Sequence, residues 1–238
     1  MVVQNVIFNL RLLIFMNYNY LILSVNKLEG KIKDVENLYF ETLQKLEEVN
    51  KDLSKFDTNA HLMGIIKPFL VEWGTMARVV NQAGLDWNGF GFTIRQLAPE
   101  FAKLQGKRFV AIDFDKEPFS TAIPTIYGKL KMFPKLGGST NVSKVIHLLN
   151  PEVFVMWDSY IRTTYHRKNK RINEFHEGYL EFLKEMQKEI MEALTERQEE
   201  TGRDLEENEK ELRKKFNHKT LARLIDEFNY ETITLKGN

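Results

Sequence analysis

Apolar residues recur along most of this sequence at spacings of three, four and seven, the pattern of helices with one buried face. The pattern holds from residue 27 to residue 80 and returns in residues 142–149, 175–194 and 221–228. Residues 110–114 (VAIDF) are the only strand candidate, and a single strand has no partner with which to form a sheet. The sequence therefore predicts an all-α, multi-helix globular domain with at most a small irregular β element.

The predicted boundaries follow from where this pattern begins and breaks. Residues 1–26 are apolar but interrupted by Asn, Gln and Arg, and their longest apolar run, 12–16, is too short to cross a membrane. They also lack the basic start and the cleavage site of a secretory signal. We treat them as an uncertain N-terminal extension and residues 27–238 as a single helical domain. One amphipathic helix is expected over residues 27–53, and the glycines of residues 84–92 predict a loop.

Composition excludes several classes of protein. Of the 238 residues 43% are hydrophobic, which suffices for a core, and 34 Lys and Arg nearly balance 33 Asp and Glu. The formal charge of +1 creates no global basic field, so a polyanion site must be a local patch. The absence of cysteine removes thiol chemistry and fits a cytoplasmic location. Neither nucleotide-binding motifs nor histidines at metal-ligand spacing occur, so we expect no cofactor and no metal.

The C-terminal third contains a strongly charged segment. Within residues 195–211 the only large apolar side chain is Leu205, so this segment has little surface to bury. We expect a charged helical projection over about residues 172–216, broken at Gly202. Residues 172–230 are accordingly the region in which a protein partner is expected to bind, if there is one.

The most informative stretch, residues 133–162, reads FPKLGGSTNVSKVIHLLNPEVFVMWDSYIR. A glycine turn separates two predicted helices, which gives a helical hairpin over residues 129–150. The first backbone N–H groups of the second helix point into the turn and suit a phosphate. The residues expected to hold that phosphate are Gly137, Gly138, Ser139 and Thr140.

Cations gather around this hairpin. No acidic residue occurs between Glu117 and Glu152, nor between Asp158 and Glu174. If the cations in these runs neutralise DNA phosphates, binding should weaken steeply with salt. The alternative interpretation is a solvated basic face on an ordinary helical protein. The cations that we expect to contact phosphate are Lys135, Lys144, Arg162, Arg167 and Lys168.

This stretch resembles the helix-hairpin-helix DNA glycosylase superfamily. Residues 136–138 (Leu-Gly-Gly) are similar to its hairpin, and Asp158 lies at the distance at which the family carries an aspartate beside its base pocket. The resemblance implies duplex DNA as partner and implies that Asp158 stabilises the positive charge developing on the sugar as the base leaves. Ser139 and Thr140 stand near the position where members that also cleave the backbone have a lysine. The implied enzyme is therefore a monofunctional glycosylase, a hydrolase without lyase activity.

The same residues have structural explanations. An aspartate directly before a helix, as Asp158 is, accepts backbone N–H bonds without any chemistry. His147 is more typical of a packed histidine than of a general base. Trp87 and Phe90, in the predicted loop, and Trp157 are candidates for stacking a flipped base, although Trp157 is equally typical of a core.

Three functions follow from these patterns. The first is a DNA-binding helix-hairpin-helix protein that excises a base through Asp158. The second is a DNA-binding protein that keeps the hairpin and has no catalytic activity. The third is a protein-interaction module built on the charged C-terminal helices, with no nucleic acid bound.

Overall fold

The computed structural model describes residues 16–29, 31–48, 52–56, 60–72, 84–136 and 138–237. These residues contain no strand, which confirms the predicted all-α class. The principal helices are α2 (Tyr18–Glu29), α3 (Lys33–Glu48), α4 (Ala60–Glu72), α6 (Trp87–Lys103), α7 (Phe119–Lys131), α8 (Ser139–Leu149), α9 (Ser159–Lys168), α10 (His176–Thr201), α11 (Leu205–Lys215) and α12 (Leu221–Asn229).

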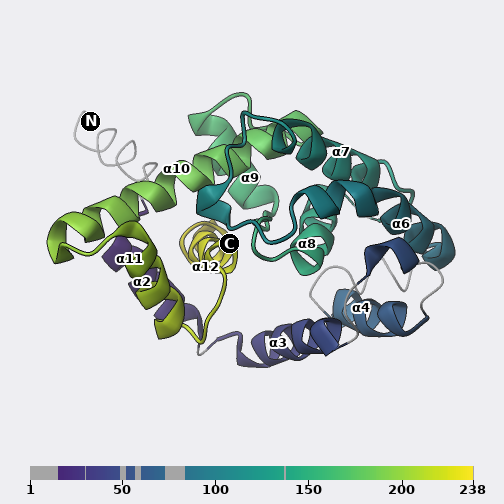
Figure 1. Cartoon of the computed structure of the whole chain (residues 1–238), viewed down its shortest axis with the longest axis horizontal. Coiled ribbons are helices and arrows are strands. Elements are labelled where there is room, and N and C mark those ends of the chain that lie inside the picture. The colour runs from purple at the N-terminus through teal and green to yellow at the C-terminus, as the bar shows by residue number, and fades with distance from the viewer. Residues whose placement is uncertain are drawn as a thin grey trace.

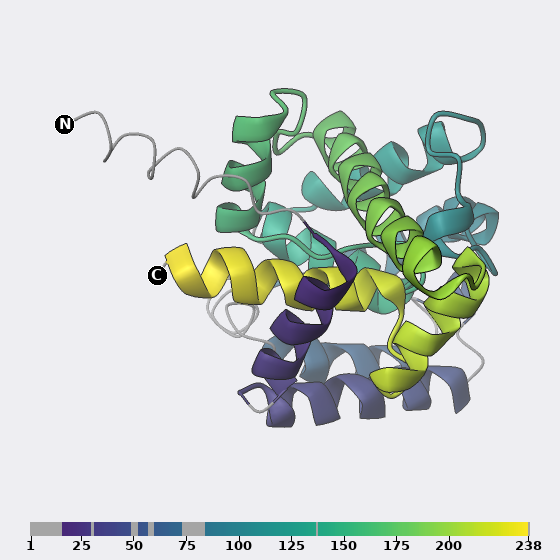
Figure 2. The same ribbon diagram turned by 90° about the vertical axis from the view of Figure 1, so that its left-hand side faces the viewer.

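Helix α12 runs through the middle of the molecule, with the other helices around it (Figures 1 and 2). Each residue of α12 is buried, although three of its nine side chains are charged. The chain then continues as a π-helical segment, Tyr230–Thr234, and a last short turn, α13 (Leu235–Gly237). Both α2 and α9 contact this C-terminal segment, so the end of the chain packs against these two helices.

The first described helix begins inside the segment that we treated as an uncertain extension. Leu21 and Val25 of α2 are fully buried, and α2 packs against α10 and α12. Residues 1–15 lie outside the described residues. The single helix predicted over residues 27–53 is wrong, because α2 ends at Glu29 and α3 and a 3-10 turn follow. Apolar spacing alone cannot show a break between two helices that both use the same period.

The predicted loop at residues 84–92 is also wrong. Asp86 accepts a hydrogen bond from the Gly89 backbone N–H at 3.0 Å, and helix α6 begins directly after this cap. A side chain at Gly89 would collide with the Asp86 carboxylate, and Gly91 is buried in the core. Gly89 and Gly91 therefore allow close packing within a helix, whereas from the sequence we expected them to form a loop.

The strand candidate at residues 110–114 is not a strand. Its first part belongs to a 3-10 turn, η2 (Phe109–Ala111), and Ile112 and Phe114 then turn into the core. Gln187 of α10 donates to the carbonyl oxygens of Phe109 and Ile112, at 2.7 Å and 2.8 Å. A side-chain amide thus provides the hydrogen bonds that a neighbouring strand would have provided.

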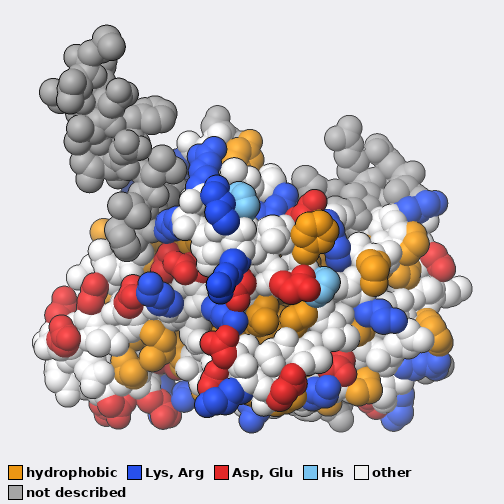
Figure 3. Space-filling view, turned by 90° about the horizontal axis from the view of Figure 1, so that it is seen from above, with side chains coloured by type: hydrophobic (Ala, Val, Ile, Leu, Met, Phe, Trp, Pro, Cys, Tyr) orange, Lys and Arg blue, Asp and Glu red, His pale blue; other side chains and the backbone are white. Residues whose placement is uncertain are grey.

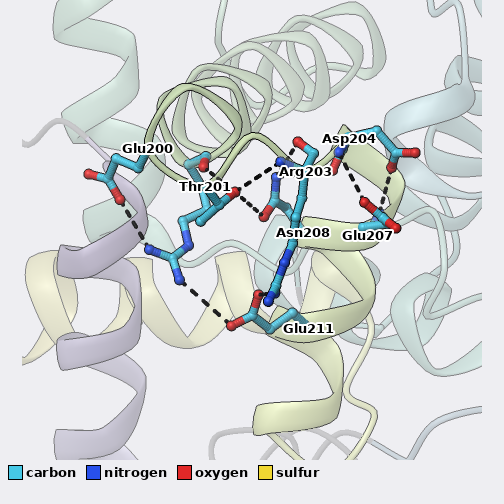
Figure 4. Close-up of polar contacts among 8 residues, drawn as sticks. Glu200, Thr201, Arg203, Asp204, Glu207, Asn208 and Glu211 are labelled. Atoms are coloured by element: carbon cyan, nitrogen blue, oxygen red, sulfur yellow. Dashed lines mark hydrogen bonds and ion pairs between the residues drawn. The ribbon is translucent and has the colours of Figure 1, made fainter.

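Helices α10 and α11 form the charged hairpin, and Gly202 turns the chain with a φ of 70°, which confirms the predicted break. Asn208 is fully buried and donates to the carbonyl oxygens of Arg203 and Asp204, at 3.1 Å and 3.0 Å. Figure 4 shows how these polar groups, together with Thr201 and Glu211, point toward one another. The hairpin is therefore packed at its tip through paired polar groups, which compensates for its few apolar residues.

Candidate nucleic-acid interface

The predicted hairpin is formed by α7, α8 and the connection between them. Gly138 precedes α8 with a φ of 87°, a left-handed conformation that favours glycine. The N-cap residue of α8 is therefore a glycine, which has no side chain to accept from the first N–H groups of the helix. Gly137 lies outside the described residues. N–H groups at the start of a helix can bind an anion.

The polar residues expected to open α8 lie in its first turn and tie the hairpin together. The Lys131 ammonium donates to the Ser139 hydroxyl at 2.9 Å, and the Asn141 amide donates to the Leu136 carbonyl oxygen at 2.9 Å. Ser139 is buried, so its hydroxyl is not available to a phosphate in the way that we expected. Thr140 is half-buried.

The predicted cations fall into two groups. Lys135 and Arg167 are exposed, and Arg162 is half-buried with its guanidinium 5.9 Å from the centre of the Trp157 ring. Lys168, in contrast, forms an ion pair with Glu189 at 3.2 Å and lies mostly inside the molecule. Only the first group has the exposure that a contact to DNA phosphate requires.

Lys144 is the second cation that the structure removes from the predicted surface. It is half-buried, and burial lowers its pKa, while the carboxylates of Asp226 and Asp158 act in the opposite direction. Its position among carboxylates could not be seen in the sequence, because Asp226 belongs to α12. We therefore exclude Lys144 from the phosphate-binding residues.

Asp158 caps α9, as the structural explanation predicted. Its Oδ1 accepts from the Ile161 backbone N–H at 2.9 Å, and its Oδ2 accepts from the Thr234 hydroxyl at 2.6 Å. The backbone N–H of Trp157 donates to the Ser143 hydroxyl at 3.2 Å, which places Asp158 beside the second turn of α8. The sequence pattern gave no signal for Thr234.

Two of the three aromatic side chains predicted to stack a flipped base are buried. Phe90 is fully buried with Phe56 and Phe133 around it, and Trp157 is buried against Tyr179. Trp87 is half-buried at the start of α6, with the Lys67 ammonium 5.2 Å from its ring centre. The stacking roles of Phe90 and Trp157 are therefore wrong, because neither ring has an open face.

His147 is a packed histidine, as predicted. Its Nδ1 donates to the Phe154 carbonyl oxygen at 2.6 Å, so its Nε2 accepts from the Tyr39 hydroxyl at 2.9 Å. Burial lowers the pKa of His147 to about 3. The hydrogen bond to Phe154 raises this pKa, but by less than burial lowers it. The imidazole is neutral at physiological pH and fixes α8 to α3.

Sequence reasoning missed a group of buried charges that we call the α12 charge cluster. The Lys219 ammonium lies 3.0 Å from a Glu227 oxygen and also pairs with Glu36. The Arg223 guanidinium lies 2.9 Å from Glu227 and 2.6 Å from Asp226. Burial raises the pKa of Asp226 to about 6 and that of Glu227 to about 7. The members of the cluster are Glu36, Lys219, Arg223, Asp226 and Glu227.

A groove of 1310 Å³ lies between α3, α6, the end of α8 and the connection from α11 to α12. Arg95, Arg213 and His218 are among its polar lining residues. Asn217 and His218 are both in a left-handed conformation, with φ values of 53° and 60°. Leu149 and Asn150, at the end of the hairpin, line this groove, but none of the residues predicted to bind DNA or to act on it does.

Other observations limit what the site can hold. In the described part of the chain, no three His, Asp or Glu side chains are placed to share a metal ion. Of the described helices, none has both the length and the apolar character needed to cross a membrane. Comparison of the chain with known protein families, curated proteins and solved structures finds no match.

Proposed function

We propose that this chain binds duplex DNA and holds its phosphate backbone at the hairpin between α7 and α8. The observation that carries the proposal is the start of α8, where the N-cap residue is a glycine, the Lys131 ammonium bonds the Ser139 hydroxyl, and the exposed cation Lys135 lies three residues before the cap in the chain. Backbone N–H groups at a helix N-terminus and a nearby ammonium are complementary to a phosphate. Phosphate contacts of this kind supply affinity without reading sequence.

The surroundings of the hairpin support the same function. The Lys131 ammonium lies 3.5 Å from Glu174, so the connection between α9 and α10 reaches the end of α7. This connection carries Lys170 and Arg171, both exposed. Figure 3 shows Lys and Arg side chains interspersed with Asp and Glu over the middle of the molecule, with Asp and Glu more frequent at its left-hand end. The hairpin and the connection from α9 to α10 thus carry exposed cations in a near-neutral protein.

The test is the salt dependence of DNA binding, measured by fluorescence anisotropy with a labelled duplex. The variant Lys135→Glu should bind more weakly than the wild type, and its log–log salt slope should be shallower by about 0.9. The control is Lys210→Glu, at a lysine of α11 whose side chain is 71% exposed, and it should bind like the wild type. Absence of binding at low salt would contradict the proposal and would favour the protein-interaction alternative.

A second candidate function, base excision by Asp158, is favoured by the position of this residue. Asp158 is half-buried beside α8, its two oxygens are held by α9 and Thr234, and the charge of Lys144 acts on the same region. A carboxylate held in this way is suited to stabilising a cationic sugar. Contacts that already occupy both oxygens are equally expected of a purely structural cap.

The variant Asp158→Asn separates the two roles of this residue. Asparagine also caps helices, so the fold should be retained while the negative charge is lost. A catalytic carboxylate predicts loss of base release from duplexes with damaged bases, with DNA binding kept. The matched control is Asp204→Asn at the cap of α11, where the side chain accepts from the Glu207 backbone N–H at 2.8 Å. If the wild type binds DNA but releases no base, the result would favour a DNA-binding protein without catalytic activity.

A further inference from the structure

Four exposed apolar side chains gather around the end of the described chain. Leu23 of α2 is 58% exposed and Tyr160 of α9 is 43% exposed, and in the C-terminal segment Tyr230 and Leu235 are 38% and 37% exposed. The Leu235 backbone N–H donates to the Tyr230 carbonyl oxygen, so these two residues lie one turn apart. We call the four side chains the C-terminal apolar surface. Apolar side chains that are exposed close together usually mark a contact surface.

Contacts of the C-terminal segment with α2 and α9 bring the members of this surface together. On one side, the Lys236 ammonium donates at 3.2 Å to the hydroxyl of Tyr20, which lies one turn before Leu23 on α2. On the other side, a side chain at Gly237 would lie 3.0 Å from the Tyr160 ring. Figure 2 shows the C-terminal segment crossing α2, with its last turn at the edge of the molecule. The surface therefore runs from α2 across the C-terminal segment to α9.

The sequence of residues 1–15 provides an apolar partner for this surface. These residues precede α2 and lie outside the described residues. They read MVVQNVIFNLRLLIF, in which only Gln4, Asn5, Asn9 and Arg11 are polar. Leaving so many apolar side chains in water is costly, and contact with an exposed apolar surface removes that cost.

The point at which residues 1–15 join the fold favours binding within the same chain. The next residue, Met16, is 4% exposed and belongs to the core, and the second turn of α2 carries Leu23. Fifteen residues span roughly 20 Å as a helix and about 50 Å when extended, which is enough to cross from α2 to α9. A short tether also keeps its segment at an effective concentration of about millimolar beside the surface, which a second copy reaches only in concentrated solution.

We propose that residues 1–15 bind the C-terminal apolar surface of the same chain and cover it. The contact removes the four side chains of the surface from water together with apolar side chains of the segment, and the hydrophobic effect stabilises it. It also holds the C-terminal segment in place between α2 and α9, where Thr234 bonds Asp158. This inference goes beyond the proposed function, because the contact does not require DNA.

The test is nuclear magnetic resonance of the full chain with one spin label, because an unpaired electron broadens the signals of nearby nuclei. The sequence contains no cysteine, so a single introduced cysteine takes the label alone. A label at Thr163→Cys, an exposed position one turn after Tyr160 on α9, should remove most of the intensity of the amide signals of residues 1–15. The control label is Gln96→Cys, exposed on α6 at the opposite end of the molecule from α2, and it should leave these signals intact (Figure 1).

Two further samples identify the surface and the copy that is bound. In the protein labelled at Thr163→Cys, the double substitution Leu23→Ser, Leu235→Ser should preserve the signals of residues 1–15, because it makes the surface polar. The matched control, Phe92→Ser, Met132→Ser, replaces side chains that are 44% and 75% exposed elsewhere, and the signals should still be lost. A mixture of spin-labelled protein with isotope-labelled protein that carries no spin label should show no loss, since the contact lies within one chain.

Each contrary result would overturn the inference. Signals of residues 1–15 that survive the label at Thr163→Cys, or that both labels remove equally, would show that the segment does not bind at this surface. Loss that persists after the double substitution would place the segment elsewhere, and loss in the mixture would show that it binds a second copy. Because the exchanged side chains are exposed, circular dichroism should show that every variant retains its helices.

Discussion

The α12 charge cluster and the hairpin use the same kind of residue in opposite settings. In the cluster, Lys219 is almost completely buried and its ammonium pairs with three carboxylates, those of Glu29, Glu36 and Glu227, whereas on the hairpin Lys135 is exposed. A buried charge must be paired because its desolvation is costly, while an exposed charge keeps its water until a partner replaces it. The comparison teaches that burial, and not the number of lysines in a stretch, decides which cations are available to a ligand.

The largest expected effect comes from removing the cation of the cluster. At pH 8, Lys219→Met should lower the free energy of unfolding by about 3–5 kcal/mol, because the buried Glu36 carboxylate loses its ion pair with Lys219 and Glu227 keeps only its pair with Arg223. Urea denaturation measures this difference. A loss below about 1 kcal/mol would mean that solvent reaches the cluster, and the contrast with the hairpin would then disappear.

The next effect is the pH dependence of stability that Glu227 of the cluster should cause. Burial raises the pKa of Glu227 from 4.5 to about 7, although Arg223 and Lys219 lower it. At pH values between 4.5 and 7, Glu227 is protonated in the folded state and ionised in the unfolded state. The contribution of Glu227 to stability therefore falls as the pH rises from 4.5 to 7. The contribution lost over this range is about 3 kcal/mol.

The variant Glu227→Gln should lack this dependence. Its free energy of unfolding, relative to the wild type, should therefore rise by about 3 kcal/mol from pH 4.5 to pH 7. Glu196→Gln, at an exposed position of α10, controls for the loss of one carboxylate. If the difference between Glu227→Gln and the wild type is the same at both pH values, Glu227 is ionised throughout, and the cluster is more polar than its burial indicates.

A smaller effect is expected at the contact between the C-terminal segment and the cap of α9. Thr234 follows α12, and its hydroxyl donates to Oδ2 of Asp158, the oxygen that does not cap α9. Thr234→Val therefore removes one hydrogen bond between the C-terminal segment and α9. We expect a loss of about 1 kcal/mol in thermal or urea unfolding. Thr163→Val, at an exposed position on α9, should cause little change. An equal effect of both variants would show that the Asp158 contact does not hold the segment.

The parts of the fold that sequence predicted are those set by local signals. Gly202 ends α10, Asn150 follows α8 and Asp158 caps α9, since each of these acts on backbone groups within a few residues. The start of α6 was missed because Gly89 is typical of a loop as well as of close packing. Local signals thus fix helix ends better than they identify the residues between them.

The parts of the site that sequence could not predict depend on contacts between distant segments. Lys219 pairs with Glu36 of α3, and Thr234 bonds Asp158, although no repeat or spacing links these positions. The exposure of a side chain also depends on contacts between distant segments. Phe90 is buried and Phe175 is exposed because different segments pack beside each ring. Composition and periodicity indicated where cations are frequent, and only tertiary packing showed which of them face solvent.

The smallest effect on stability is expected when the lysine-to-methionine substitution made in the cluster is made on the hairpin instead. Lys135→Met should change the free energy of unfolding by no more than about 0.5 kcal/mol, because the side chain is exposed and the left-handed backbone, with a φ of 64°, is equally strained for both residues. DNA affinity should nevertheless fall, since one phosphate contact is lost. Comparing Lys219→Met and Lys135→Met in one urea series and one anisotropy series therefore separates a cation that supports the fold from a cation that is free to bind. If Lys135→Met destabilises the protein as much as Lys219→Met does, the hairpin cation is structural, and its proposed role toward DNA loses its basis.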